Sequence, residues 1–288
     1  MSRSINALAL VPLALVPLAT ARFATAHAAS HGGGAIALRY RFVPGQTFAY
    51  RFIESGRATA TGDLSIQDGF TAPYRSIGSA TVRERVLSVD ARGRAMVAVS
   101  VSVLHATETR GRTTTTSPTT TTTVTVQIAT DGNGSGTMIG TVNEAFFLPL
   151  GTLPAGPLPL KTRWTTPSRL LKVITPALPT QFPHPTVVNT LLSVGPVRGP
   201  RGTILATITS AAQPMYAPVT LPFSRRETLR LQGTGQATGR TVFDVASGQL
   251  LSSTASYTIE LDQQMRDQPG GERTARTRIV WDMSFQRI

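Results

Sequence analysis

Two acidic side chains are the first candidates for chemistry. Glu260 and Asp262 stand two residues apart, so a β-strand would place both on one face, as in the carboxylate pair of a glycosidase. That face is polar, and Arg276 and Arg278 stand on the strand that we expect to pair with it. Cross-strand ion pairs account for both carboxylates without catalysis, so we interpret them as an exposed charged surface.

The usual motifs of metal sites and hydrolases do not occur. The chain contains no cysteine, and His31, His105 and His184 are too far apart in sequence to indicate a metal site. His105 stands in phase with Val101 and Val103, so we expect a partly buried structural histidine. The Gly-x-Ser-x-Gly pentad of serine hydrolases does not occur. We therefore predict a protein that is not an enzyme and uses neither cofactor nor metal.

The middle of the chain is basic. Overall, 28 basic and 15 acidic residues give a net charge of +13, and no Asp or Glu occurs between Ala145 and Arg226. This excess is typical either of a surface for an anionic partner, such as lipid headgroups or acidic glycans, or of a solvated basic face. The candidate ligand-binding residues are Lys161, Arg163, Trp164, Arg169 and Lys172.

Residues 1–28 have the pattern of a secretory signal peptide. Arg3 precedes an apolar run from Ala7 to Ala19, and Ala26-His-Ala28 is a small-x-small cleavage site. A membrane anchor is the alternative, but the run is shorter than the roughly 20 residues that a spanning helix requires. We expect an exported protein, periplasmic or extracellular, that does not span a membrane after cleavage. Export also argues against nucleic acid as its partner.

Alternating apolar residues indicate long antiparallel strands. From Gln249 to Phe285 the apolar positions recur with a period of two on both sides of a Pro-Gly-Gly turn, which predicts a closing hairpin with Trp281 in its core. The same pattern over residues 82–103 turns at Asp90-Ala-Arg-Gly93. A first hairpin is expected at Pro44-Gly45, between apolar residues at 36–42 and 48–52.

Three segments are less regular. The threonine run at 112–123 favours a hairpin that turns at Ser117-Pro118, with a glycosylated stalk as the alternative. A short helix is expected at 143–148, with Asn143 as its N-cap. Two proline-rich connectors at 149–159 and 176–185 mark the expected boundary between units.

Similar sequence patterns recur in the two halves of the chain, which indicates a duplicated unit. Leu87-Ser-Val89 and the Arg-Gly turn after it are answered by Leu192-Ser-Val194 and a second Arg-Gly turn, and the turn at 131–134 is answered at 243–248. Turn chemistry alone would give some of these matches, so coincidence is the alternative. The expected organisation is a signal peptide at 1–28, a first β unit at 29–150, a connector with a basic strand at 151–185 and a second β unit at 186–288.

We therefore expect an all-β protein of antiparallel hairpins and meanders. Its two duplicated units, of roughly five or six strands each, would form a curved sheet, a half-barrel or a barrel-like sandwich.

The chain resembles uncharacterised secreted bacterial β-rich proteins. The resemblance rests on Phe42-Val-Pro-Gly-Gln-Thr-Phe-Ala-Tyr50, the proline-rich approach to Trp164, and the Val-Phe-Asp segment between Gly239 and Leu250. In architecture alone, the expected curved sheet is similar to the periplasmic half-barrel lipoprotein carriers, which hold acyl chains in an apolar concavity. The predicted function is non-catalytic binding of an apolar or anionic envelope ligand, such as a lipid. A structural or adhesive cell-envelope module is the alternative.

Overall fold

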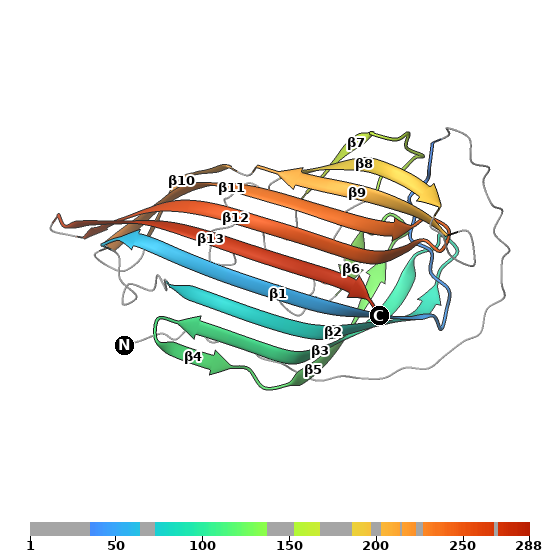
Figure 1. Cartoon of the computed structure of the whole chain (residues 1–288), viewed down its shortest axis with the longest axis horizontal. Helices are drawn as coiled ribbons and strands as arrows, with labels where there is room; N and C mark the ends of the chain where they lie inside the picture. The colour runs from blue at the N-terminus through green and yellow to red at the C-terminus, as the bar shows by residue number, and fades with distance from the viewer. Residues whose placement is uncertain are drawn as a thin grey trace.

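The protein forms one large antiparallel β-sheet in a computed structural model, which describes residues 35–63, 73–136, 153–167, 186–196, 203–213, 215–222, 227–267 and 270–288 (Figure 1). Eleven of its 13 strands follow the order β6-β5-β3-β2-β1-β13-β12-β11-β9-β8-β7, while β4 pairs with β3 and β10 with β11. The sheet is open and strongly curved, as predicted. The strands are β1 (Thr47–Gly62), β2 (Tyr74–Val89), β3 (Ala95–Arg110), β4 (Thr113–Thr116), β5 (Thr120–Ile128), β6 (Gly134–Gly136), β7 (Arg163–Pro167), β8 (Thr186–Pro196), β9 (Ile204–Ala212), β10 (Met215–Pro222), β11 (Glu227–Asp244), β12 (Gln249–Asp267) and β13 (Glu272–Arg287).

The closing hairpin of the sequence analysis is confirmed. β12 and β13 pair along nearly their whole length, with Tyr257 opposite Trp281. β13 then pairs with β1, which joins the first and last long strands of the chain in one sheet. The predicted turn at Asp90 is also present, because its Oδ1 accepts hydrogen bonds from the backbone N–H groups of Arg92 and Arg94, and Gly93 has φ 77°.

The side chains of the sheet alternate between two faces. We call inner the face that carries the main core, and outer the opposite face. The main core unites residues near one edge of the sheet, such as Val97 and Val126, with residues near the other edge, such as Leu191 and Ile208. Because both edges contribute to one cluster, the curved sheet turns its inner face onto itself. A second cluster on β9, β11 and β12 contains Ala212, Ala237, Tyr257, Ile259 and Leu261.

The first predicted hairpin is wrong. Residues 36–42 do not pair with β1; apart from one bridge between Ile36 and Leu158, they form no part of a described strand. Their backbone instead bonds to the two distant turns, with the Tyr40 N–H donating to Thr130 and the Arg41 N–H to Gly248. Leu38 is completely buried in the main core. Alternation predicted an extended chain correctly, but the apolar side chains fill the inside of the curved sheet.

The threonine run forms strands but not the expected hairpin. β4 and β5 both pair with β3, one after the other, and Ser117 donates its backbone N–H to Ala106 between them. The chain therefore continues in one direction past Pro118, which lacks the N–H of a ladder residue and only interrupts the pairing. The reversal occurs earlier, at Gly111, whose φ is 58°.

His105 is exposed, contrary to expectation. A register shift in the β2–β3 ladder lies between Ser79, which pairs with His105, and Ala80, which pairs with Val103. The extra residue reverses the alternation, so His105 leaves the face that Val101 occupies. A single sequence gives no sign of such a bulge.

The two halves of the sheet share local geometry. The β2–β3 and β8–β9 ladders both shift register, at Leu87 and Leu192, and both leucines are exposed. Just before each half's first strand, a residue with positive φ donates its N–H across the ladder, Gly45 to Val86 and Lys161 to Leu191. These are matches that a duplicated unit predicts, and duplication stays a prediction.

The predicted helix at 143–148 and most of both proline-rich connectors lie outside the described residues. Within the described part, no helix is long and apolar enough to cross a membrane.

Candidate functional site

The predicted basic residues lie at the β7 edge of the sheet. Lys161 and Arg163 are exposed, whereas Trp164 is half-buried and packs against the main core. Arg169 and Lys172 lie outside the described residues, so ligand binding by this group stays a prediction.

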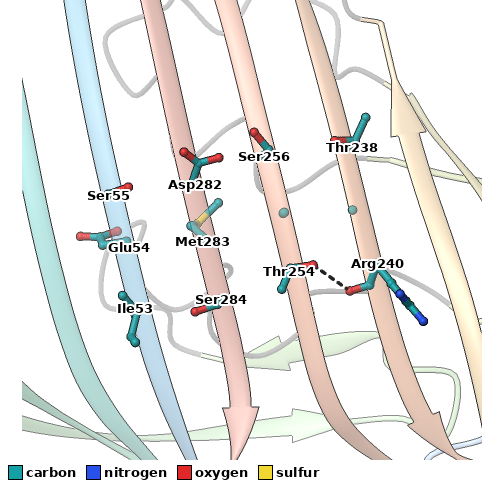
Figure 2. Close-up of a pocket in the computed structure, with 12 residues that line it drawn as sticks. Ile53, Glu54, Ser55, Thr238, Arg240, Thr254, Ser256, Asp282, Met283 and Ser284 are labelled. Atoms are coloured by element: carbon teal, nitrogen blue, oxygen red, sulfur yellow. Dashed lines mark hydrogen bonds between the residues drawn. The ribbon is translucent and has the colours of Figure 1, made fainter.

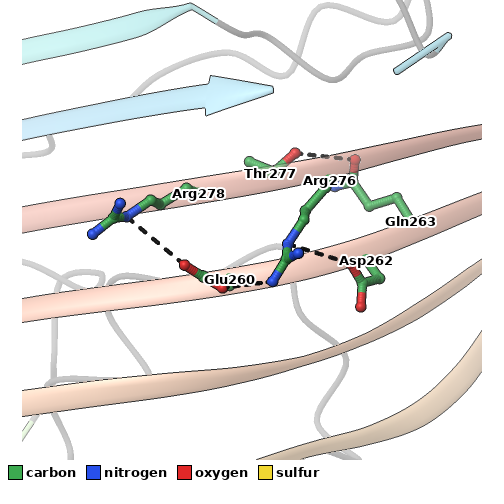
Figure 3. A network of polar contacts seen from close by, with 6 residues as sticks. All are labelled: Glu260, Asp262, Gln263, Arg276, Thr277 and Arg278. Carbon is green, nitrogen blue, oxygen red and sulfur yellow. Dashed lines mark hydrogen bonds and ion pairs between the residues drawn. The ribbon is translucent and has the colours of Figure 1, made fainter. Parts of the chain in front are cut away.

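The two candidate carboxylates form the ion pairs that the sequence predicts. Glu260 lies opposite Arg278 and Asp262 opposite Arg276 in the β12–β13 ladder. Arg276 lies 2.8 Å from Glu260 and 3.8 Å from Asp262, and Arg278 lies 3.9 Å from Glu260. Figure 3 draws these ion pairs as dashed lines. The arginines neutralise both carboxylates on an exposed face. Three or more His, Cys, Asp or Glu side chains do not gather into a metal-binding group anywhere in the described ranges.

A shallow groove of about 510 Å³ crosses the outer face over β1, β13, β12 and β11 (Figure 2). Outward side chains form its walls, while Glu54, Met283, Ala255 and Gly239 lie in the row between them. Its one outward carboxylate and one guanidinium come from Asp282 and Arg240. The remaining outward residues that line it are Ile53, Ser55, Thr238, Thr254, Ser256 and Ser284.

A second feature lies on the inner face, where two glycines make room for larger side chains. A Cβ atom on Gly56 would lie 2.8 Å from Cε3 of Trp281 and 2.7 Å from Oγ of Ser76. A Cβ atom on Gly78 would lie 2.8 Å from Oε1 of Glu54. The pairings explain this geometry, because Gly56 lies opposite both Trp281 and Ser76, and Gly78 lies opposite Glu54. We call Glu54, Ser76 and Trp281, with these glycines, the Glu54 patch.

The polar groups of the Glu54 patch have unused hydrogen-bonding capacity. Nε1 of Trp281 and Oγ of Ser76 are buried and complete no hydrogen bond of normal geometry, although the Tyr74 hydroxyl lies near Ser76. Burial raises the pKa of the Glu54 carboxyl group, and the nearby Trp281 indole opposes this in part without completing a hydrogen bond of normal geometry. Buried polar groups without partners are costly, so Trp281 Nε1 and Ser76 Oγ would each gain a favourable hydrogen bond if a ligand atom reached them.

The apolar surroundings of the Glu54 patch are only half-buried. Ala255, Ile279, Trp281 and Met283 pack against the second cluster, but none of them is fully covered. Met283 also packs against the main core, so this strip lies between the two cores. The arrangement provides an apolar surface beside a small polar group.

The main core contains one further polar feature, Glu84. Its side chain lines a cavity of about 30 Å³ together with Tyr40 and Tyr50. Burial raises the pKa of Glu84 to about 7, and the buried hydroxyl of Tyr40 has no hydrogen-bond partner. The cavity has room for a water molecule, which accounts for these groups without a functional role.

Sequence reasoning missed the Glu54 patch. Trp281 was expected to be an ordinary core residue, and nothing drew attention to Glu54 or Ser76. The available signal was Gly56 and Gly78 inside otherwise regular strands, since a glycine within a strand often marks a place where another group approaches the backbone closely.

Comparison with models of known protein families and with curated protein sequences finds no match to this chain. The resemblance to secreted bacterial β-rich proteins therefore stays a prediction.

Proposed function

We propose that this protein is a non-catalytic, exported binding protein that holds an apolar or amphipathic envelope ligand, such as an acyl lipid, on the inner face of its sheet. One observation carries the proposal. The half-buried Trp281 presents an apolar ring and a buried N–H without a partner at the same place.

The polar end of the ligand would lie at the Glu54 patch. Trp281 Nε1 donates a hydrogen bond, the Ser76 hydroxyl donates or accepts, and Glu54 retains a proton more readily than an exposed carboxyl group, since burial raises its pKa. These groups suit a carboxyl, ester or hydroxyl group. A strongly ionic group with no counter-charge would be less well accommodated there.

The apolar end would cover the strip of half-buried side chains formed by Ala255, Ile279 and Met283. Burying apolar surface contributes about 25 cal/mol per Å², so an acyl chain over this strip would supply most of the affinity. The exposed cations Lys161 and Arg163 at the β7 edge are the proposed basic rim for an anionic headgroup.

Native mass spectrometry of the protein purified from a bacterial host that exports it, followed by solvent extraction, tests the proposal. We expect a bound lipid that is lost on extraction and whose occupancy falls in a Met283→Arg variant. Arg230→Met, the reverse exchange at an exposed position of the outer face, is the control and should leave the occupancy unchanged. A protein that is empty in every preparation, and that binds no added fatty acid, would contradict the proposal.

A further inference from the structure

The outer face of β1 and β2 is strongly basic. Five exposed arginines project from it, and the outward positions of these two strands carry no Asp or Glu in the part of the chain that the structure describes. They form two groups near opposite ends of the strands. One group is Arg51, Arg83 and Arg85, and the other is Arg57 and Arg75.

Arg57 lies directly opposite Arg75 in the β1–β2 ladder. Like charges directly opposite each other destabilise a sheet. Considering the described residues, no carboxylate forms an ion pair with any of the five arginines. Within the described part of the chain, this pairing therefore costs stability that no ion pair offsets.

The outward arginines of β12 and β13, on the same face, are paired with carboxylates. On β12 and β13, each outward arginine near the hairpin lies within 4 Å of a carboxylate, as with Arg276 and Glu260 (Figure 3). The contrast shows that a basic composition alone does not force arginines to face each other. Arg230 and Arg240 on β11 also have no ion pair among the described residues, but neither lies opposite another arginine, as Arg57 and Arg75 do.

Exposed aliphatic side chains lie between the two arginine groups. Ile53 is 45% exposed and stands between Arg51 and Arg57 on β1. Ile77 is 37% exposed and stands two residues beyond Arg75 on β2. Leu104, at the neighbouring β3 bulge, is 54% exposed. Large apolar side chains gathered on a charged outer face are typical of an interaction surface.

We propose that the outer face of β1 and β2 docks onto a bilayer that contains anionic phospholipid. Arginines bind headgroup phosphates through two parallel N–H donors, and the isoleucines between them enter the headgroup layer. The aliphatic residues favour a bilayer over a soluble polyanion, because a polyanion offers no apolar region to receive them. This inference uses only the outer face and does not depend on a ligand of the inner face.

Vesicle sedimentation tests the docking surface. The exported form of the protein is mixed with vesicles of equal parts phosphatidylglycerol and phosphatidylcholine, or with phosphatidylcholine alone. We expect binding only to the anionic vesicles, with the affinity falling as salt rises. Each unit of charge near an anionic surface changes the affinity about fivefold, so the charge reversal Arg57→Glu, which changes the charge by two units, should reduce binding by roughly 25-fold.

Arg57→Glu also tests whether the arginine pair serves the fold. The substitution would place a carboxylate opposite Arg75, so the variant should melt at the same or a higher temperature while it binds vesicles less well. Arg230→Glu, an equal charge change on exposed β11, should retain wild-type binding. Binding unaffected by Arg57→Glu, or weakened equally by Arg230→Glu, would overturn the proposal.

The variant Ile53→Ser distinguishes a bilayer from a soluble polyanion. We expect it to weaken vesicle binding several-fold while leaving retention by polyphosphate chains unchanged. If Ile53→Ser binds vesicles as the wild type does, and polyphosphate competes fully for the protein, the surface recognises polyanions and the bilayer proposal is wrong.

Discussion

Gly56 lies directly beneath Trp281, so close that a Cβ atom at position 56 would lie 2.8 Å from Cε3 of the indole. The same Cβ atom would lie 2.7 Å from Oγ of Ser76. The Glu54 patch therefore exists because β1 has no side chain at the position where its two neighbouring strands place a ring and a hydroxyl group.

The variant Gly56→Ala should displace the indole from its place. Overpacking of this kind costs about 1–3 kcal/mol, and we expect a loss in the free energy of unfolding of that size, together with weaker ligand binding. Urea denaturation and ligand titration measure the two effects. Gly195→Ala is the matched control, because a Cβ atom there meets nothing within 4 Å. Equal effects of the two substitutions would show that the space above Gly56 has no special role.

Ser76→Ala should stabilise the empty protein and weaken ligand binding. The Ser76 hydroxyl is buried without a partner, and removing such a group relieves a desolvation penalty of about 1 kcal/mol. Ser253 is the matched control, since it is also buried but lies 2.9 Å from the Thr241 hydroxyl in a hydrogen bond. Ser253→Ala should therefore destabilise the protein by about 1 kcal/mol. Thermal denaturation of both ligand-free variants shows whether each substitution raises or lowers the melting temperature.

Glu84 should make the protein less stable as pH rises. Its pKa is raised from 4.5 to about 7 by burial, so the folded state holds the proton more tightly than the unfolded state does. The resulting cost is absent below pH 4.5, grows between pH 4.5 and about 7, and is complete above that range, reaching up to about 3 kcal/mol.

Urea denaturation of the Glu84→Gln variant between pH 4.5 and 8 measures this cost. The variant should lose most of the wild-type decline in the free energy of unfolding, because an amide does not titrate. The exposed control Glu272→Gln should retain the decline. A wild type whose stability rises over this range would show that other groups dominate.

The position in the second half that corresponds to Glu84 is also polar and buried, but it has hydrogen-bond partners. Asn189 precedes Leu192 by the same interval as Glu84 precedes Leu87, and it is completely buried. Asn189, however, donates to Thr166 Oγ1 at 3.0 Å and accepts from Ser210 Oγ at 2.6 Å. The second half thus provides hydrogen-bond partners for its buried polar side chain, while in the first half the Glu84 carboxyl group lies beside a small cavity.

The fold class followed from the period of two, which is a local property of the chain. The ion pairs of Glu260 and Asp262 with Arg276 and Arg278 followed for the same reason, since alternate residues of paired strands share one face. The path of residues 36–42 could not be predicted in this way, because alternation indicates an extended chain but does not identify the strand that it pairs with. The β3 bulge that exposes His105 also left no local sign.

The Glu54 patch is a property of three strands together. β1 and β2 are neighbours in sequence, but β13 joins them only through the pairing of the first long strand with the last. Gly56 and Trp281 are more than 200 residues apart and meet through that pairing alone. Single-sequence reasoning had no means to place them opposite each other.

Fluorescence of Trp281 tests the central claim most directly. The chain has two tryptophans, so Trp164→Phe leaves Trp281 as the only indole and thus as a reporter within the proposed site. Titration of this variant with palmitate should give a saturable change in emission with one fatty acid bound per chain, and Gly56→Ala should reduce the affinity. Emission that does not change up to the solubility limit of the fatty acid would contradict the proposal that the inner face binds an apolar ligand.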